Sequence, residues 1–398
     1  MRRSTVFAII AAALAVMLSS GIRQSFGLFV IPVSELFGGE RATFSVALAW
    51  NSIIYGLPIV GILADRIGSR IVLLGGGIVY VAGLVLWSII DNQGGLFISV
   101  SVMIGLALSA TSYVVVLGAV AQLVPPETRS RSFGIITAAG SSGMFVVPPL
   151  TQWLIDAQDW RTTLLVLAAV ASIIIFLGLA LPSKRDGDEE NSAELHEPFI
   201  KLLQSARKHN GYLLLVAGFF VCGFHVAFVA AHLPAYLADK GLGEIGAVSL
   251  SLIGVFNLIG SYLFGWLGDF YRKKYLLSLL YLLRAVAFAV FLFVPLTRSS
   301  GLIFAAAIGF LWLATVPLTS GTVAQIFGTR NLSTMFGIVF LSHQVGAFLG
   351  VWLGGLSFDR LGTYDPIWIA SIILGTVAAV IHLPITDEPI SKKIALQS

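Results

Sequence analysis

The chain has 398 residues, of which 57% are hydrophobic and only 11% are charged. A soluble globular domain carries about a quarter charged residues, so a soluble enzyme is excluded. The formal net charge of +4 gives no reason to expect a nucleic acid partner. Apolar runs of about 20 residues recur along the chain, and each is long enough to cross a bilayer as a helix. The composition therefore predicts an all-α polytopic membrane protein.

Charged and Gly/Pro-rich breaks divide the chain into twelve predicted transmembrane spans. In chain order they cover residues 5–35, 43–64, 71–90, 96–123, 131–155, 162–182, 211–238, 245–268, 275–295, 301–327, 333–357 and 364–384. We expect an N-terminal six-helix bundle (1–182), a cytoplasmic linker (183–210), a C-terminal six-helix bundle (211–384) and a cytoplasmic tail (385–398). Within the linker, the apolar residues of 198–209 have helical spacing, which suits either a short helix on the membrane surface or a solvated linker.

The two halves of the chain repeat each other. The segment "SSGIRQSFGLFVIPVSELF" aligns with "VCGFHVAFVAAHLPAYLAD", "GILADRIGSR" with "GWLGDFYRKK", and "AQLVPPETRSRSFGI" with "AQIFGTRNLSTMFGI". The three offsets are 202, 204 and 203 residues, which indicates one duplication of six spans. Two parallel six-helix repeats with a substrate path between them are the plan of a secondary transporter.

The distribution of lysine and arginine predicts the topology. With the N-terminus inside, the inner segments hold seventeen of the 24 cations and the outer segments hold five. This bias predicts that both termini are cytoplasmic. The two cations left over are Arg23 and Arg284, which both lie within spans.

The loop "GILADRIGSRIVL" between spans two and three resembles the signature loop of the major facilitator superfamily. Its weaker copy, "GWLGDFYRKKYLL", lies between spans eight and nine, where that superfamily repeats the motif. In the family these residues form a cytoplasmic charge cluster that holds the halves together when the transporter faces outward. The resemblance therefore implies a gating role for Gly61, Asp65, Arg66, Gly68, Arg70, Gly265, Asp269 and Arg272.

Within that superfamily, the chain resembles bacterial monocarboxylate-porter-like and oxalate:formate antiporter-like proteins. The similar stretches are "RQSFGLFVIP", "GSSGMFVVPPLTQWLIDAQDWR" and "FGIVFLSHQVGAFLGVWLGGLSFDRLGTYD". The resemblance implies a monomer in the bacterial inner membrane. Members of this group often carry a cation in span eight, whereas span eight of this chain has none and carries Asn257 among its polar residues.

Arg23 is the candidate substrate ligand, because no intramembrane carboxylate is available to pair with it. At about 1.5 Å per residue, it lies roughly 30 Å along the helix from Arg3 and 18 Å from Glu35. A buried cation costs at least about 2.5 kcal/mol on insertion, so it usually faces a cavity or a partner. The planar guanidinium binds a carboxylate with two hydrogen bonds and cannot be deprotonated. The missing partner would then be a transported anion.

The repeat extends this candidate site. Arg23 aligns with His225, and the family's first and seventh spans line its central cavity. The predicted substrate-binding residues are Arg23, Gln24, Asn51, Tyr113, His225, His343 and Gln344. Histidine titrates near neutral pH, so His225 and His343 are the candidates for proton coupling. The alternatives stay open: Arg23 and Arg284 could bond helix carbonyls, and the histidines could be neutral structural groups.

Together these features predict a secondary transporter that works by alternating access and carries small organic anions, with monocarboxylates as the expected class. Both proton symport and anion exchange fit the sequence. Two other functions remain as alternatives, an efflux transporter for amphiphilic drugs or signal molecules and a non-transporting membrane sensor. Because the sequence has no metal-ligand cluster, Walker loop or nucleophile–base arrangement, we expect neither enzyme activity nor a metal or cofactor.

Overall fold

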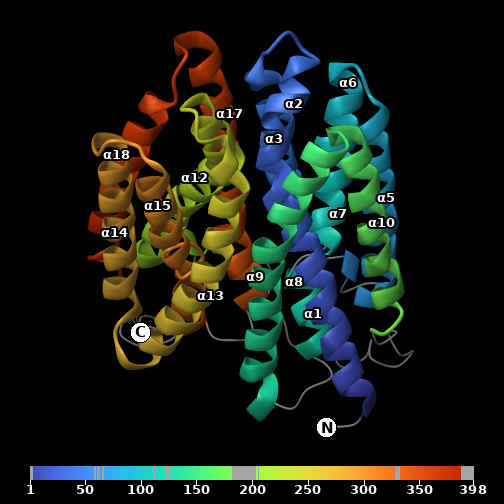
Figure 1. Cartoon of the computed structure of the whole chain (residues 1–398). Coiled ribbons are helices and arrows are strands. Elements are labelled where there is room, and N and C mark those ends of the chain that lie inside the picture. The colour runs from blue at the N-terminus through green and yellow to red at the C-terminus, as the bar shows by residue number, and fades with distance from the viewer. Residues whose placement is uncertain are drawn as a thin grey trace, which may run out of the picture.

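Every regular element that the structure describes is a helix (Figure 1). The structure is a computed structural model, and it describes residues 3–57, 60, 63–64, 67–111, 113–121, 126–181, 203–204, 206–327 and 332–386. The linker residues 183–202 and the tail residues 387–398 lie outside these ranges, and so do the signature-loop residues Gly61, Asp65 and Arg66.

Six spans make up the first half of the chain. The first consists of α1 (Arg3–Gln24), the 3₁₀ turn η1 (Ser25–Phe29) and α2 (Val30–Glu35), and the second contains α3 (Arg41–Tyr55). The third is α5 (Ser69–Ile89). The fourth consists of α6 (Gln93–Leu96), the π-helical segment η2 (Phe97–Ile104), α7 (Gly105–Ala110) and α8 (Tyr113–Ala121). The fifth and sixth are α9 (Pro126–Ala157) and α10 (Trp160–Gly178).

The second half repeats this order. The seventh span is α12 (Asn210–Asp239), and the eighth consists of η3 (Gly243–Ile245) and α13 (Gly246–Phe270). The ninth is α14 (Lys273–Phe293), and the tenth consists of α15 (Arg298–Phe310) and α16 (Thr315–Phe327). The last two are α17 (Leu332–Leu361) and α18 (Asp365–His382).

Ten helices of the described chain are long and apolar enough to cross a membrane. The other two spans contain α3 and α9. The described part of α3 has 15 residues, and α9 carries two prolines in its interior, Pro148 and Pro149. The prediction of an all-α protein with twelve membrane helices is confirmed.

Each half has its own aromatic core. In the first half, Trp87 is fully buried and contacts Phe26, Phe29 and Phe44 at ring-centroid distances of 5.1–5.5 Å. In the second half, Trp368 contacts Phe228, among other rings, at 4.6 Å. Packing of this kind holds each group of helices together by burying large apolar surfaces.

Glycines allow the closest helix crossings in both halves. A Cβ at Gly143 of α9 would lie 1.9 Å from the carbonyl oxygen of Met17 on α1. A Cβ at Gly346 of α17 would lie 1.9 Å from the carbonyl oxygen of Phe220 on α12. Because 346 − 143 = 203, these crossings occupy matching places in the repeat.

The fourth and tenth spans are both interrupted. The first interruption follows α7 at Thr111, and the second separates α15 from α16 at Leu311–Ala314. A side-chain hydrogen bond holds each interruption. The Ser19 and Thr111 hydroxyls lie 2.6 Å apart, and the Cys222 sulfur lies 3.3 Å from the Thr315 hydroxyl. The offsets are 203 and 204 residues, so both bonds belong to the repeat.

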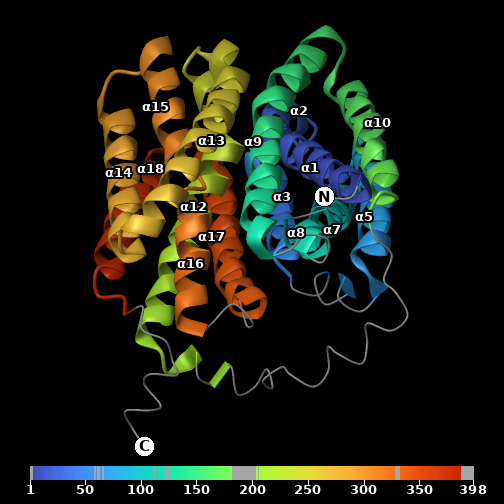
Figure 2. The same ribbon diagram turned by 90° about the horizontal axis from the view of Figure 1, so that it is seen from below.

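The halves meet along two pairs of helices, α3 with α17 and α9 with α13 (Figure 2). We call the surface along these contacts the seam. A Cβ at Gly254 of α13 would lie 2.7 Å from the backbone of Met144 on α9, so the second pair is in close contact. The turns α2–α3 and α17–α18 lie at the upper end in Figure 1, and α1 begins at the lower end.

Candidate functional site

An ion pair joins the halves at the upper end of the seam. Arg41 begins α3, and its Nη1 and Nη2 donate to the two carboxylate oxygens of Asp239 at 2.6 and 2.7 Å. Nη1 also donates to the Tyr364 hydroxyl at 2.9 Å, and the guanidinium lies 3.7 Å above the Phe358 ring. Burial alone would lower the pKa of Arg41, but the hydrogen bonds to Asp239 and Tyr364 raise it above its ordinary value.

A second carboxylate completes this contact. Asp359 of α17 accepts hydrogen bonds from the backbone N–H groups of Arg41 and Ala42 at 3.0 and 2.7 Å. A helix in the first half is thus capped by a residue of the second half. We call Arg41, Asp239, Asp359 and Tyr364 the upper lock. The three hydrogen-bonded links hold the first half against α12, α17 and the turn before α18.

Arg23 lies in the last turn of α1, half-buried, below the closed part of the seam. One turn further along, a Cβ at Gly27 would lie 2.2 Å from the Ala230 carbonyl oxygen, so α12 closes over the first span there. The Arg23 guanidinium lies 5.1 Å from the centre of the Tyr55 ring. The structure gives it neither a hydrogen bond nor an ion pair with the residues that it describes. Its donors are therefore free to bind an anion.

Aromatic rings continue from Arg23 across the seam. Tyr55 ends α3 and contacts Phe340 of α17 edge-on at 5.6 Å. Phe340 is stacked on His343 at 5.7 Å, with the ring planes 10° apart. Beside them, a Cβ at Gly56 would lie 2.5 Å from the Gln344 side chain. The region around Arg23 is therefore connected to His343 through Tyr55 and Phe340, and Gln344 lies beside Gly56.

The other predicted site residues lie in different surroundings. Gln24 is buried next to Arg23 along the chain, and its Nε2 has no described partner. Asn51 donates to the Val100 carbonyl at 2.7 Å. Tyr113 lies against Gly140 of α9. The described contacts of these last two residues are within the first half.

His225 is not brought together with Arg23. Its Nε2 lies 2.9 Å from the Ser371 carbonyl oxygen, and its ring packs on Phe288 at 4.8 Å. The side chain therefore lies inside the second half, among α12, α14 and α18. His343 is the candidate histidine at the seam.

The described members of the predicted gating motif lie at helix ends. Gly68 has φ +96° before the start of α5, a conformation that favours glycine. Arg70 follows in the first turn of α5. In the second copy, a Cβ at Gly265 would lie 3.8 Å from the Pro317 side chain, Asp269 is exposed near the end of α13, and Arg272 lies 5.9 Å from the centre of the Tyr275 ring. Gly61, Asp65 and Arg66 lie outside the described residues.

Several residues of this region were missed by sequence reasoning. The upper lock looked like ordinary loop charge, and Tyr55 looked like one of many aromatic residues in a span. Asn257 was noted only as a polar residue, yet it joins three helices. Its Nδ2 donates to the Ser141 hydroxyl on α9 at 3.3 Å, and its Oδ1 accepts from the Leu313 N–H at 2.9 Å. The sequence signal that could have identified Asn257 was its position as a polar residue in the eighth span, which carries no cation.

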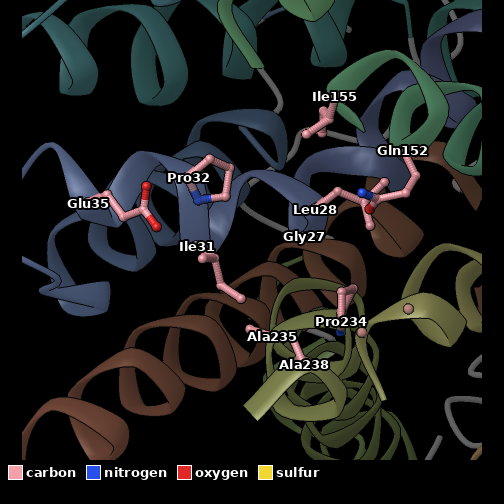
Figure 3. Close-up of a pocket in the computed structure, with 12 residues that line it drawn as sticks. Gly27, Leu28, Ile31, Pro32, Glu35, Gln152, Ile155, Pro234, Ala235 and Ala238 are labelled. Carbon is pink, nitrogen blue, oxygen red and sulfur yellow. The ribbon is translucent and has the colours of Figure 1, made fainter. Parts of the chain in front are cut away.

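A separate pocket of about 280 Å³ lies on the seam near the upper end (Figure 3). Its lining is mainly apolar and comes from the first, fifth, seventh and eighth spans. The lining residues are Gly27, Leu28, Ile31, Pro32, Glu35, Gln152, Ile155, Pro234, Ala235, Ala238, Gly243 and Gly246. None of them is a predicted substrate-binding residue.

Known proteins similar to this chain are transporters. It is 25% identical over 391 residues to the uncharacterized MFS-type transporter YcxA of Bacillus subtilis, covering 94% of this chain and 93% of the relative. It is 26% identical over 384 residues to monocarboxylate transporter 13 of Rattus norvegicus, covering 92% of this chain and 85% of the relative.

Solved structures share the fold at low sequence identity. A bacterial homologue of the human lysosomal transporter Spinster, in an inward-facing and unoccupied conformation, gives a TM-score of 0.72 at 12% identity. A D-xylose-proton symporter gives 0.73 at 15% identity. Each comparison covers 96% of this chain and 97% of the other. The model of the Major Facilitator Superfamily matches residues 10–350 and again 247–398. The chain therefore belongs to the Major Facilitator Superfamily, a family of transporters and not of enzymes.

Proposed function

We propose that this secondary transporter carries small organic anions of the monocarboxylate class, with Arg23 as the residue that binds the carboxylate. One observation carries the proposal. Arg23 is a permanent cation within a span, and it lacks an acidic partner among the described residues. Since an unpaired charge inside a membrane protein is costly, it usually faces a cavity or a partner. A substrate that brings one negative charge would complete the site.

The neighbouring residues suit a short organic acid. The Tyr55 ring supports the guanidinium from one side, which leaves its fork of donors for a carboxylate. Tyr55 and Phe340 offer apolar surface for a short carbon chain, and Gln24 offers a buried amide without a described partner. Curated relatives named monocarboxylate transporter 12 and 13 support the same substrate class at 23–26% identity.

Alternating access gives the upper lock its role. We place the upper end outside and both termini in the cytoplasm of a bacterial cell, with the protein as a monomer in the inner membrane. In this orientation the structure represents a state closed to the outside. Loading from outside then requires Arg41 to separate from Asp239 and Asp359, while the predicted charge cluster around Asp65 and Asp269 closes the cytoplasmic side. Of the two histidines predicted as candidates for proton coupling, His343 is better placed than His225 because it adjoins the seam.

The test is uptake of labelled short mono- and dicarboxylates into liposomes that contain the purified protein. Arg23→Gln should abolish anion uptake, and Arg23→Lys should retain part of it because the charge stays while the fork is lost. Arg298→Gln removes one positive charge from an exposed helix start and is the matched control. Normal uptake by a folded Arg23→Gln protein would move the site elsewhere. Loss of folding in that variant would make Arg23 a structural cation.

Efflux of amphiphilic molecules is the competing function, and the mainly apolar pocket near Glu35 favours it. The same liposomes separate the two functions. Transport of a cationic dye that depends on Glu35, without any carboxylate uptake, would replace the proposal.

A further inference from the structure

A second buried cation lies within the second half of the protein. Arg284 of α14 is 1% exposed, and its Nε and Nη2 donate to the Leu311 carbonyl at 3.0 and 2.6 Å. Nη2 also donates to the Trp312 carbonyl. Arg284 thus caps the end of α15, where the tenth span is interrupted and carbonyl groups lack helical partners. Its Nη1 has no hydrogen-bond partner among the described residues, and neither described ion pair includes it.

The single cysteine of the chain lies at the same interruption. Cys222 of α12 is fully buried and bonds the Thr315 hydroxyl, three residues beyond the Trp312 carbonyl that Arg284 caps. Arg284 and the Cys222 sulfur are therefore bonded to the same short interruption of the tenth span. The His343 ring contacts the Phe219 ring, one turn before Cys222 on α12, at 4.9 Å, and the Arg284 guanidinium lies 5.4 Å from the centre of the Tyr281 ring. A thiol, a histidine and an unpaired guanidinium nitrogen therefore lie in one buried region of the second half.

The internal repeat shows which part of this cluster is structural. In the first half, Ser19 and Thr111 make the matching bond, and Tyr80 stands where the second half has Arg284 (284 − 80 = 204). A hydroxyl is therefore sufficient to hold the interrupted helix. The second half differs by pairing an ionisable thiol with a permanent cation, and a structural bond needs neither.

We propose that Cys222 is the buried acid that binds and releases the transported proton, with Arg284 as the counter-charge of its thiolate. The inference rests on the proposed function, since it supplies proton coupling for the anion transporter. In the releasing step the S–H bond breaks, the electron pair stays on sulfur, and the proton passes to the neutral His343 ring, which then gives it to water and is neutral again. His343 stacks on Phe340 at the seam, so it connects the thiol to the region around Arg23.

Charge balance supports this assignment. The empty carrier holds Arg23 and Arg284 as cations and Cys222 as a thiolate, so these groups sum to +1. The loaded carrier holds the same two cations, one bound anion and a neutral thiol, which again sum to +1. Equal charge lets both forms reorient across the membrane without an unbalanced buried charge.

The surroundings of the sulfur contain no other described acid to perform this role. Thr315 of α16 bonds the sulfur, Arg284 and Tyr281 of α14 and His343 of α17 are the charged and titratable groups packed in the same region, and His225 lies one turn along α12 itself. Tyr281 in turn stacks on His382 of α18. None of these groups is a carboxylate.

Variants of Cys222 test the pairing with Arg284. Cys222→Asp places a permanent carboxylate beside the cation, and it should melt within a few degrees of the wild-type protein. Ser99→Asp is the control, because Ser99 is fully buried and its described hydrogen bond goes to the Leu96 carbonyl of its own span and not to a cation; this variant should lose much of its thermal stability. Equal destabilisation by the two substitutions would overturn the pairing of Cys222 with Arg284.

Transport by Cys222→Ser tests the coupling. Serine keeps the bond to Thr315 but cannot ionise, so exchange of external for internal anion should continue while accumulation driven by a pH gradient falls to the level without a gradient. Full pH-driven accumulation in this variant would overturn the proposal. If the wild-type protein moves no anion at all, the proposed function fails instead.

A spectroscopic measurement is independent of any substrate. The chain contains one thiol, so the infrared S–H stretching band of the protein in lipid reports Cys222 alone. The band should disappear reversibly as the pH is raised while the protein stays folded, and it should be absent from Cys222→Ser. A band that persists across the whole folded range would show that Cys222 is a structural thiol.

Discussion

Asp239→Asn should open the upper end of the transporter. In the structure, the Asp239 carboxylate accepts from both Nη groups of Arg41 at 2.6 and 2.7 Å. The amide that replaces it is neutral and retains one oxygen acceptor. Arg41 then keeps its bond to Tyr364 but loses its opposite charge. The state in which the halves separate at the upper end, where water solvates Arg41, gains population.

The size of this shift follows from the exposure of the pair. The side chains of Arg41 and Asp239 are 9% and 27% exposed, so the pair is neither fully buried nor fully solvated. A hydrogen bond to a charged group contributes about 1.5–3 kcal/mol. Loss of one such bond, about 2 kcal/mol, changes the ratio of closed to open states roughly thirtyfold, since about 1.4 kcal/mol corresponds to tenfold.

Pulsed electron resonance between spin labels at Glu40→Cys and Arg360→Cys measures this opening, because both positions are exposed beside the upper lock. Cys222 is fully buried, so the labels go to the introduced cysteines. Asp156→Asn is the matched control, since Asp156 is exposed and bonds Gln152 on its own helix. A distance distribution for Asp239→Asn identical to that of the control would refute the role of the ion pair in closure.

Three further outcomes are expected. Tyr55→Leu should weaken anion binding about threefold or more, because a cation–π contact with Arg23 contributes about 0.5–2 kcal/mol. Tyr55→Phe keeps the aromatic ring and should bind the anion nearly as well as the wild-type protein. Equal affinities of the two variants in an equilibrium binding assay would contradict the stacking of Tyr55 on Arg23. Gly143→Ala should lower the free energy of unfolding by about 1–3 kcal/mol, since the new Cβ would meet a backbone carbonyl of α1 that cannot move aside. An unchanged melting temperature would contradict this expectation. The Thr162 hydroxyl and the N–H groups of the first turn of α10 hold the pKa of Asp159 below its usual range. The stability that Asp159→Ala removes is therefore present above about pH 3.9 and is lost as the pH falls below it, so melting curves of the two proteins should converge only in acid.

The sequence was sufficient to predict the helices and their duplication. Hydrophobic length identifies membrane spans directly, because backbone groups in lipid must bond within their own helix. The repeat adds a relation between distant residues, and the bonds Ser19–Thr111 and Cys222–Thr315 occupy matching places in it. The sequence also predicts that Arg23 lacks a carboxylate partner within the membrane, since this depends only on which residues the spans contain.

The orientation of side chains could not be predicted from the sequence in the same way. Alignment gives His225 the same position along its helix as Arg23, but it does not fix the rotation of that helix against its neighbours. The acceptor of His225 is the Ser371 carbonyl, 146 residues away, so tertiary packing determines where its ring lies. For the same reason Arg41 and Asp239, 198 residues apart, looked like unrelated loop charges.

The most direct test of the central claim is equilibrium binding of a labelled short monocarboxylate to the purified wild-type, Arg23→Lys and Arg23→Gln proteins. Removal of the guanidinium removes hydrogen bonds to a charged group that contribute about 1.5–3 kcal/mol each, so Arg23→Gln should bind at least about tenfold more weakly. Arg23→Lys should lie between the two, and all three proteins should melt at similar temperatures. Wild-type affinity in a folded Arg23→Gln protein would contradict the assignment of Arg23 as the anion site.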